Sequence, residues 1–169
     1  MMPSAAVVRV PERIQGHFRS LAALIGDTPL VELECALDGV PLRVFAKHEV
    51  LNLTGSIKDR MALGILREAW ESGAVHAGTT IVEATSGNTG IAFAALGRAL
   101  GHPVRIYMPD WMSQERKLLI RSLGAEIVPI SAAEGGFLGS IALADAFAAE
   151  QPSERFLPHQ FANPANARA

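Results

Sequence analysis

The sequence contains a single cysteine, Cys35, among its 169 residues. One thiol can form neither a disulfide within the chain nor a cysteine-based zinc site, and the five histidines are scattered. Neither a disulfide framework nor a metal centre is therefore expected. A lone cysteine in an apolar chain is usually a small buried hydrophobe, so we expect Cys35 to be buried.

A strong charge imbalance and long apolar runs are also missing. The net charge of -2 at pH 7 gives no electrostatic reason to expect nucleic acid or an anionic membrane as a partner. No apolar stretch approaches the roughly 20 residues that span a bilayer. The short apolar run at 5–8 is followed by Arg9, Glu12 and Arg13, which makes a poor secretory signal. The expected location is the cytoplasm, where a single thiol stays reduced.

Several familiar catalytic motifs are absent from the sequence. It has no GxxxxGK[ST] phosphate loop, no HExxH, no CxxC and no GxSxG. The Gly-Asn-Thr-Gly at 87–90 is not the GxGxxG of a dinucleotide-binding fold.

What the sequence does contain is a regular alternation of strand and helix patterns. Apolar residues make up 49% and charged residues 19%, as in a well-buried globular protein. Residues 11–33 are expected to form a helix, a Gly-Asp-Thr-Pro turn and a strand. Short connections between alternating elements predict an α/β fold: an open, mainly parallel twisted sheet with helices on both faces. Beyond residue 42 the pattern predicts strands at 43–48, 79–85, 103–109, 125–130 and 155–158, and helices at 56–73, 87–101, 113–124 and 136–150.

Lys58 stands where the small polar loop of residues 52–60 runs into a predicted helix. The positive end of the helix dipole disfavours an ammonium there, which makes the neutral amine needed for Schiff-base chemistry more accessible. Most lysines are solvated, however, and this position alone favours that interpretation. Ser56 is the expected N-cap with Asp59 three residues later, and Gly73 is the expected stop.

The segment 83–90, Glu-Ala-Thr-Ser-Gly-Asn-Thr-Gly, follows a predicted strand and opens a predicted helix. Backbone N–H groups at a helix start bind anions, and hydroxyl groups add donors. A helix cap alone would need one such residue, whereas residues 85–90 are all hydroxyl, amide or glycine residues. Open parallel sheets also bind ligands at the carboxyl ends of their strands. We therefore predict a phosphate or carboxylate site here.

Two other places are less distinctive. Gln160, in the segment 159–166 after a predicted strand, could donate hydrogen bonds to a ligand at the same sheet edge, but a polar loop explains its spacing equally well. Gly135 and Gly136 fit a flexible helix entry. Glu83 and Asp59 do not form an obvious acid–base pair.

Taken together, five segments resemble the cysteine synthase (O-acetylserine sulfhydrylase) and cystathionine β-synthase group of fold-type II pyridoxal-phosphate enzymes. The resemblance covers nearly all of the chain after the first predicted helix, and it implies the tryptophan synthase β-like fold. The segments are IGDTPLVEL at 25–33, NLTGSIKDR at 52–60, TIVEATSGNTGIAFAALGRALGH at 80–102, MPDWMSQERKLLIRSLGAEIV at 108–128 and QFANPANARA at 160–169.

The resemblance implies a role for each matching residue. Lys58 would carry pyridoxal 5′-phosphate as a Schiff base and then act as base and acid on the substrate. Asn88 would hydrogen-bond the 3′-oxygen of the cofactor, and Gln160 would contact the substrate carboxylate. The remaining carboxylate contacts would come from one loop: Thr85, Ser86, Gly87, Asn88 and Thr89. The anion at this loop would then be the substrate carboxylate, not the cofactor phosphate.

The implied reaction is β-replacement on an O-activated serine to make cysteine. The cofactor ring accepts electrons from the α-carbon, the β-substituent leaves, and a sulfur nucleophile adds. The alternatives are a cystathionine β-synthase-like activity and a non-enzymatic role through protein association. The family also implies an amino-acid substrate, a homodimer and docking of a serine acetyltransferase.

Compared with this family, the sequence is expected to be a truncated N-terminal portion. The family's Gly-rich phosphate-binding loop should follow the 160–166 segment and is absent from this sequence, so we expect weak or no cofactor loading. We also expect exposed apolar surface and an unpaired sheet edge. The implied domains are 12–42 in the larger domain, 43–150 as the smaller α/β domain, and 151–169 as the return to the larger one.

Overall fold

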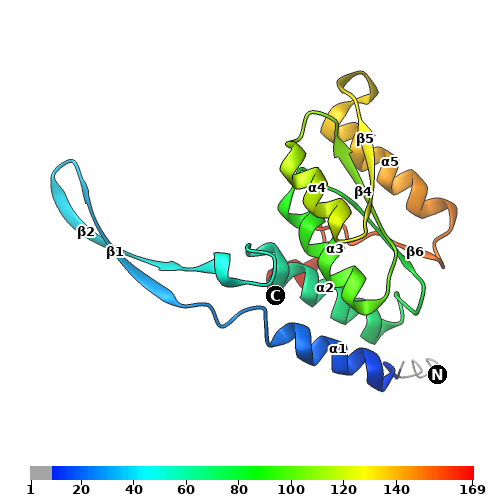
Figure 1. Ribbon diagram of the computed structural model, residues 1–169, viewed down its shortest axis with the longest axis horizontal. Coiled ribbons are helices and arrows are strands. Elements are labelled where there is room, and N and C mark those ends of the chain that lie inside the picture. The colour runs from blue at the N-terminus through cyan, green and yellow to red at the C-terminus, as the bar shows by residue number, and fades with distance from the viewer. Residues whose placement is uncertain (1–8) are drawn as a thin grey trace, which may run out of the picture.

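The computed structural model describes residues 9–169, and the apolar run at 5–8 lies outside this range. A layered α/β unit carries a β-hairpin that projects away from it (Figure 1). Within residues 9–169, no helix is long and apolar enough to cross a membrane. The helices are α1 (Glu12–Ala22), α2 (Lys58–Ser72), α3 (Asn88–Leu100), α4 (Gln114–Ser122), α5 (Gly136–Glu150) and α6 (Pro164–Arg168), with 3-10 turns η1 (Glu49–Leu51) and η2 (Ala132–Glu134).

Four strands form the main sheet, in the order β5-β4-β3-β6, and every neighbouring pair is parallel. The two central strands are almost completely buried, as expected when helices cover both faces of a parallel sheet. The predicted parallel α/β sheet is therefore confirmed. Its strands are β3 (Thr80–Ala84), β4 (Val104–Pro109), β5 (Glu126–Ile130) and β6 (Arg155–Phe156).

Helices cover both faces of this sheet. α5 packs on one face, while α3 and α4 pack on the other; α2 lies against α3, and α1 and α6 lie against α2 (Figure 1). The larger core cluster includes Phe93, Leu96 and Ile106, and the smaller includes Val82 and Ala144 on the α5 side. Each fully buried large apolar side chain contributes about 1.5–3 kcal/mol to folding.

The predicted strand at 43–48 does not belong to the parallel sheet. It forms β2 (Val40–Lys47), which pairs antiparallel with β1 (Leu30–Leu37) in a projecting hairpin (Figure 1). The turn is Asp38-Gly39, with φ of 51° and 80°. Two successive positive φ values suit a two-residue hairpin turn, and an Asp-Gly pair between apolar runs is its sequence signal. The prediction that residues 43–48 form a strand of a βαβ unit is therefore wrong, because the turn pairs this segment with β1.

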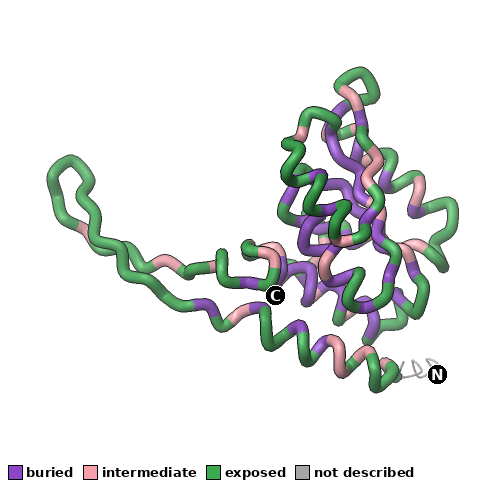
Figure 2. The backbone as a smooth tube through the Cα atoms, in the orientation of Figure 1, coloured by how far each residue is buried: buried purple, intermediate pink, exposed green. Residues whose placement is uncertain are grey.

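The expectation that Cys35 is buried is also wrong. Most residues of the hairpin are exposed (Figure 2), and Cys35 lies opposite Leu42 on one of its faces. Directly paired residues share a face, so this face also carries Leu33 with Val44, among other apolar pairs. The exposed apolar surface that the sequence led us to expect is present on the hairpin.

α3 lies unusually close to the sheet because glycine occurs at two contact positions. A Cβ atom at Gly90 would lie 2.7 Å from the Thr85 Cγ2, and a Cβ at Gly97 would lie 2.4 Å from the Val104 Cγ2. Neither distance is compatible with a side chain. The two glycines therefore set the height of α3 above β3 and β4.

The loop that leads into α2 is fixed by a polar cluster. Glu49 accepts hydrogen bonds from the Arg60 guanidinium, at 2.7 Å from Nε and 3.0 Å from Nη2. It also accepts from the Thr28 hydroxyl and the Asn52 amide, both at 2.7 Å. Asn52 in turn accepts from the Gly26 backbone N–H at 2.8 Å. The cluster ties the segment before the hairpin to the first turn of α2. The Arg60 hydrogen bond is the main reason that the pKa of Glu49 falls to about 2.

Adding one methyl group should have opposite effects at two helical glycines. Gly97→Ala forces α3 away from Val104, so we expect a loss of about 1–3 kcal/mol in the free energy of unfolding. Gly16→Ala in α1 meets only Arg19, at 3.8 Å, and should gain about 0.5–1 kcal/mol from helix propensity. Urea denaturation of both variants measures these changes in the free energy of unfolding. Similar shifts in the two variants would contradict the close approach of α3.

Acid should weaken the Glu49 cluster. The folded-state pKa of about 2 lies below the ordinary value of 4.5, so the contribution of Glu49 is fully present above pH 4.5 and is lost as the pH falls towards 2. Glu49→Gln should therefore flatten the pH dependence of the free energy of unfolding in this window. Glu115→Gln, which neutralises an exposed carboxylate near the start of α4, is the control. A Glu49→Gln curve parallel to that of the unsubstituted chain would refute the role of this carboxylate.

Candidate functional site

All seven predicted site residues line one pocket of about 300 Å³ at the carboxyl end of β3. Three segments meet there: the start of α2, the β3–α3 connection and the segment after β6. No group of three or more His, Cys, Asp or Glu side chains that could hold a metal occurs within residues 9–169. The seven residues are Lys58, Thr85, Ser86, Gly87, Asn88, Thr89 and Gln160.

Lys58 is the first residue of α2 and is half-buried. Its backbone N–H donates to the Ser56 hydroxyl at 3.2 Å. The expected capping pair of Ser56 and Asp59 is wrong, because the buried Asp59 carboxylate accepts from Thr54 instead, through the backbone N–H at 2.6 Å and the hydroxyl. This bond closes the loop in front of Lys58 and fixes where its side chain leaves the helix. Gly73 ends α2 as expected, with φ of 78°.

The β3–α3 connection presents polar groups to the pocket. The buried Thr85 hydroxyl accepts the Gly87 backbone N–H at 3.1 Å, which folds the connection back on itself. Ser86 and Asn88 are exposed where they line the pocket. Their side chains are therefore available to a ligand.

The start of α3 offers backbone donors to the same pocket. The helix has no side-chain cap, and its first backbone bond runs from the Ile91 N–H to the Gly87 carbonyl at 3.1 Å. The N–H groups of Asn88, Thr89 and Gly90 precede that bond. Unpaired first-turn N–H groups and the positive end of the helix dipole favour an anion at this place.

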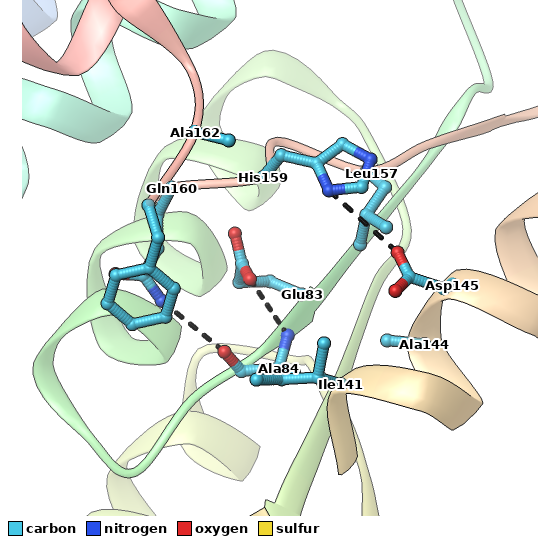
Figure 3. A pocket seen from close by; sticks show the side chains of 10 residues that line it. Glu83, Ala84, Ile141, Ala144, Asp145, Leu157, His159, Gln160 and Ala162 are labelled. Carbon is cyan, nitrogen blue, oxygen red and sulfur yellow. Dashed lines mark hydrogen bonds and ion pairs between the residues drawn. The ribbon is translucent and has the colours of Figure 1, made fainter. Parts of the chain in front are cut away.

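Gln160 reaches the site from the segment after β6. Its Oε1 accepts from the Thr89 hydroxyl at 2.7 Å. Its Nε2 donates to the Ala84 carbonyl at 3.3 Å, as Figure 3 shows. Its backbone carbonyl accepts from the Asn166 amide at 2.8 Å. Gln160 is buried, so its orientation is set by these bonds. They hold the segment after β6 against the start of α3.

Three further residues complete the wall of the pocket and were not predicted: Arg116, Phe137 and Phe161. Arg116 reaches from α4 over the β3–α3 connection, where its Nη1 donates to the Ser86 carbonyl at 3.4 Å. A signal for Arg116 existed, because α4 also begins at the carboxyl edge of the parallel sheet. The same signal applied to Phe137, at the start of α5, and Phe161 directly follows the predicted Gln160.

The family profile described as pyridoxal-phosphate dependent enzyme matches residues 21–169. Among curated relatives, cysteine synthase from Staphylococcus aureus (strain Mu50 / ATCC 700699) is 41% identical over 147 residues, which cover 87% of this chain and 46% of the relative. The chain thus spans about half the length of the curated relatives it matches.

Solved structures agree with the sequence match. The hydrogen sulfide-producing enzyme from Fusobacterium nucleatum is 55% identical with a TM-score of 0.86, covering 90% of this chain and 46% of that one. Cysteine synthase from Entamoeba histolytica is 34% identical with a TM-score of 0.77, covering 98% and 48%. The sheet and its flanking helices match the tryptophan synthase β-like fold in the N-terminal portion of these proteins. This chain is a homologue of the cysteine synthases and belongs to the pyridoxal-phosphate dependent enzyme family.

Proposed function

We propose that this sequence supplies the lysine and the carboxylate-binding groups of a pyridoxal-phosphate-dependent cysteine synthase-like enzyme. The reaction is β-replacement on an O-activated serine. The observation that carries the proposal is the convergence of Lys58, the β3–α3 connection and Gln160 on one pocket. Family membership supports the cofactor.

The pocket residues fit one end of this cofactor. A half-buried amine on Lys58 is accessible to an aldehyde, as Schiff-base formation requires. Asn88 presents an exposed amide, which suits the ring hydroxyl oxygen. When bound, the cofactor would supply an electron sink for the substrate α-carbon.

The other groups of the pocket suit the substrate. The N–H groups at the start of α3, the Ser86 hydroxyl and the Gln160 amide are donors for a carboxylate. Arg116 adds a positive charge at the rim. The Lys58 amine, once released by the incoming amino acid, would take the proton from the substrate α-carbon.

We also propose the domain organisation and the partners that the family pattern implies. Residues 43–150 would form the smaller domain, and residues 12–42 and 151–169 would belong to the larger one. A homodimer and a serine acetyltransferase partner are part of the same proposal.

Reduction with borohydride tests the lysine assignment directly. The chain has three lysines, Lys47, Lys58 and Lys117. After incubation with excess pyridoxal phosphate and reduction, which traps even weakly held cofactor covalently, peptide mapping should find the pyridoxyl label on Lys58, because Lys58 lines the pocket. Lys58→Ala should lose the label and the cofactor absorbance band. Lys47→Ala, at the base of the exposed hairpin, should keep both. Labelling of Lys47 or Lys117 in place of Lys58, or of no lysine, would contradict the proposal.

Release of hydrogen sulfide from cysteine is a second candidate function. It is favoured by the 55% identity to the hydrogen sulfide-producing enzyme from Fusobacterium nucleatum, compared with 41% and 34% for the two cysteine synthases. Both reactions would use the same lysine and the same donors to the substrate carboxylate, so this pocket suits either reaction.

Two assays in the presence of excess pyridoxal phosphate separate these functions. Cysteine alone should yield sulfide if the second function holds, whereas O-acetylserine with sulfide should yield cysteine if the first holds. Lys58→Ala should reduce either rate by about 10³-fold or more, because it removes the group that binds the cofactor and moves the proton. A rate unchanged in that variant would contradict both functions.

A further inference from the structure

A second cavity, of about 170 Å³, lies behind the candidate site. It shares two wall residues with the site pocket, Gln160 and Phe161. Apolar side chains from α5 and from the segment after β6 make up much of its wall, including Ile141 and Leu157. The buried carboxyl of Glu83 also lines it, next to Ala84 (Figure 3).

Glu83 is only 4% exposed and is incompletely hydrogen-bonded. Its Oε1 accepts the Ala84 backbone N–H at 2.9 Å, while its Oε2 is buried without a hydrogen-bond partner in residues 9–169. A charge is costly in such surroundings, whereas a neutral carboxyl is not. Burial accordingly raises the pKa of Glu83 to about 7, against the opposing effect of the backbone N–H groups of Ala84 and Gln160.

A short chain of hydrogen bonds joins Glu83 to the site. Ala84 donates its N–H to the Glu83 carboxyl, and its carbonyl, which belongs to the next peptide group, accepts from the Gln160 Nε2. The Gln160 Oε1 accepts the Thr89 hydroxyl. A change at the Glu83 carboxyl therefore acts on the backbone of Ala84, whose carbonyl orients Gln160.

We propose that Glu83 is a positioning residue of the candidate site, which aligns Gln160 through the backbone of Ala84 and favours a bound carboxylate when it is neutral. The inference rests on the proposed function, since it requires a carboxylate in the pocket of the candidate site, the front pocket. An ionised Glu83 would place a negative charge behind the Gln160 wall and repel that carboxylate. Binding would then draw one proton from solvent onto Glu83, by linkage.

Other charged groups near Glu83 are more accessible to solvent. Asp145 of α5 lines the cavity and raises the pKa of Glu83 by repulsion. His159 lies 3.8 Å from Asp145, and both side chains are about half exposed. From β4, the residue paired with Glu83 is the apolar Ile106. Lys58 lies in the front pocket, with Gln160 in the shared wall. Solvent screens the charges of the Asp145–His159 pair, whereas the carboxyl of Glu83 is buried away from solvent.

Propionate binding to the 169-residue chain tests the proposal without cofactor. Propionate carries a carboxylate but no amine, so it does not itself titrate between about pH 6 and pH 8. Amide chemical shifts of Gly87 and Gly90 report binding. We expect the Kd to rise about three- to tenfold across this range. About tenfold is the limit for one linked proton on a group whose pKa in the free chain is about 7. Glu83→Gln keeps a polar group of the same size, and its Kd should be independent of pH. Glu83→Leu should bind more weakly at every pH.

His159→Asn is the matched control, because Asn tolerates the positive φ of 50° at this position. The His159→Asn variant should keep the pH dependence of the propionate Kd. If this variant loses the pH dependence, the titrating group is His159 and the proposal is overturned. An unsubstituted chain whose propionate affinity does not change with pH, or that does not bind propionate, would also overturn it. Lys58 labelling is unaffected by those outcomes, so failure of this inference can be distinguished from failure of the proposed function.

Infrared spectroscopy of the free chain gives a measurement that needs neither ligand nor cofactor. At pH 6 a protonated carboxyl stretch should be present, and it should be missing from the Glu83→Gln spectrum. Absence of this band in the unsubstituted chain would overturn the proposal even if a variant fails to fold.

Discussion

The hydrogen bond from the Thr89 hydroxyl to the Gln160 side chain is the contact on which the candidate site depends. It spans 2.7 Å between buried residues that are 71 positions apart in the sequence. Such a bond is worth only about 1 kcal/mol net, but leaving either buried partner unpaired costs about 1–3 kcal/mol. That asymmetry makes one arrangement of the segment after β6 preferable to its alternatives.

The sheet order makes this contact possible. β6 lies beside β3 and parallel to it, so the chain leaves both strands at the same edge. The Thr89 side of the contact depends on the close approach of α3, because a side chain at Gly90 would collide with Thr85. Lys58 reaches the same edge through another route, since α2 packs on α3 and the Glu49 cluster fixes the loop before it. Three separate constraints therefore place the lysine, the connection and the amide around one pocket.

Local signals predicted the parallel sheet and the β3–α3 connection, whereas the role of Lys58 came from the resemblance to the family. Strand–helix alternation identifies a parallel sheet without knowledge of distant contacts, and a run of hydroxyls and glycines after a strand is informative by itself. Features that depend on distant partners could not be predicted in the same way. Cys35 is exposed because its hairpin projects from the unit, and Asp59 bonds Thr54 because the loop curls back. The Asp38-Gly39 turn was a usable signal that the alternation pattern obscured.

Glu83 shows why a fold can retain a group that costs stability. An apolar residue would fill the same volume without an unpaired buried oxygen, so packing does not explain the carboxyl. An apolar residue, however, would leave the Ala84 N–H without its acceptor. The carbonyl of the same residue accepts from Gln160, so loss of the acceptor would loosen the site itself. The front pocket has positive groups from Lys58, Arg116 and the start of α3, all of which favour an anion. A neutral carboxyl behind them orients the amide without reducing that attraction, whereas an ionised one opposes it. The position thus satisfies a backbone donor at the cost of a dependence on proton concentration.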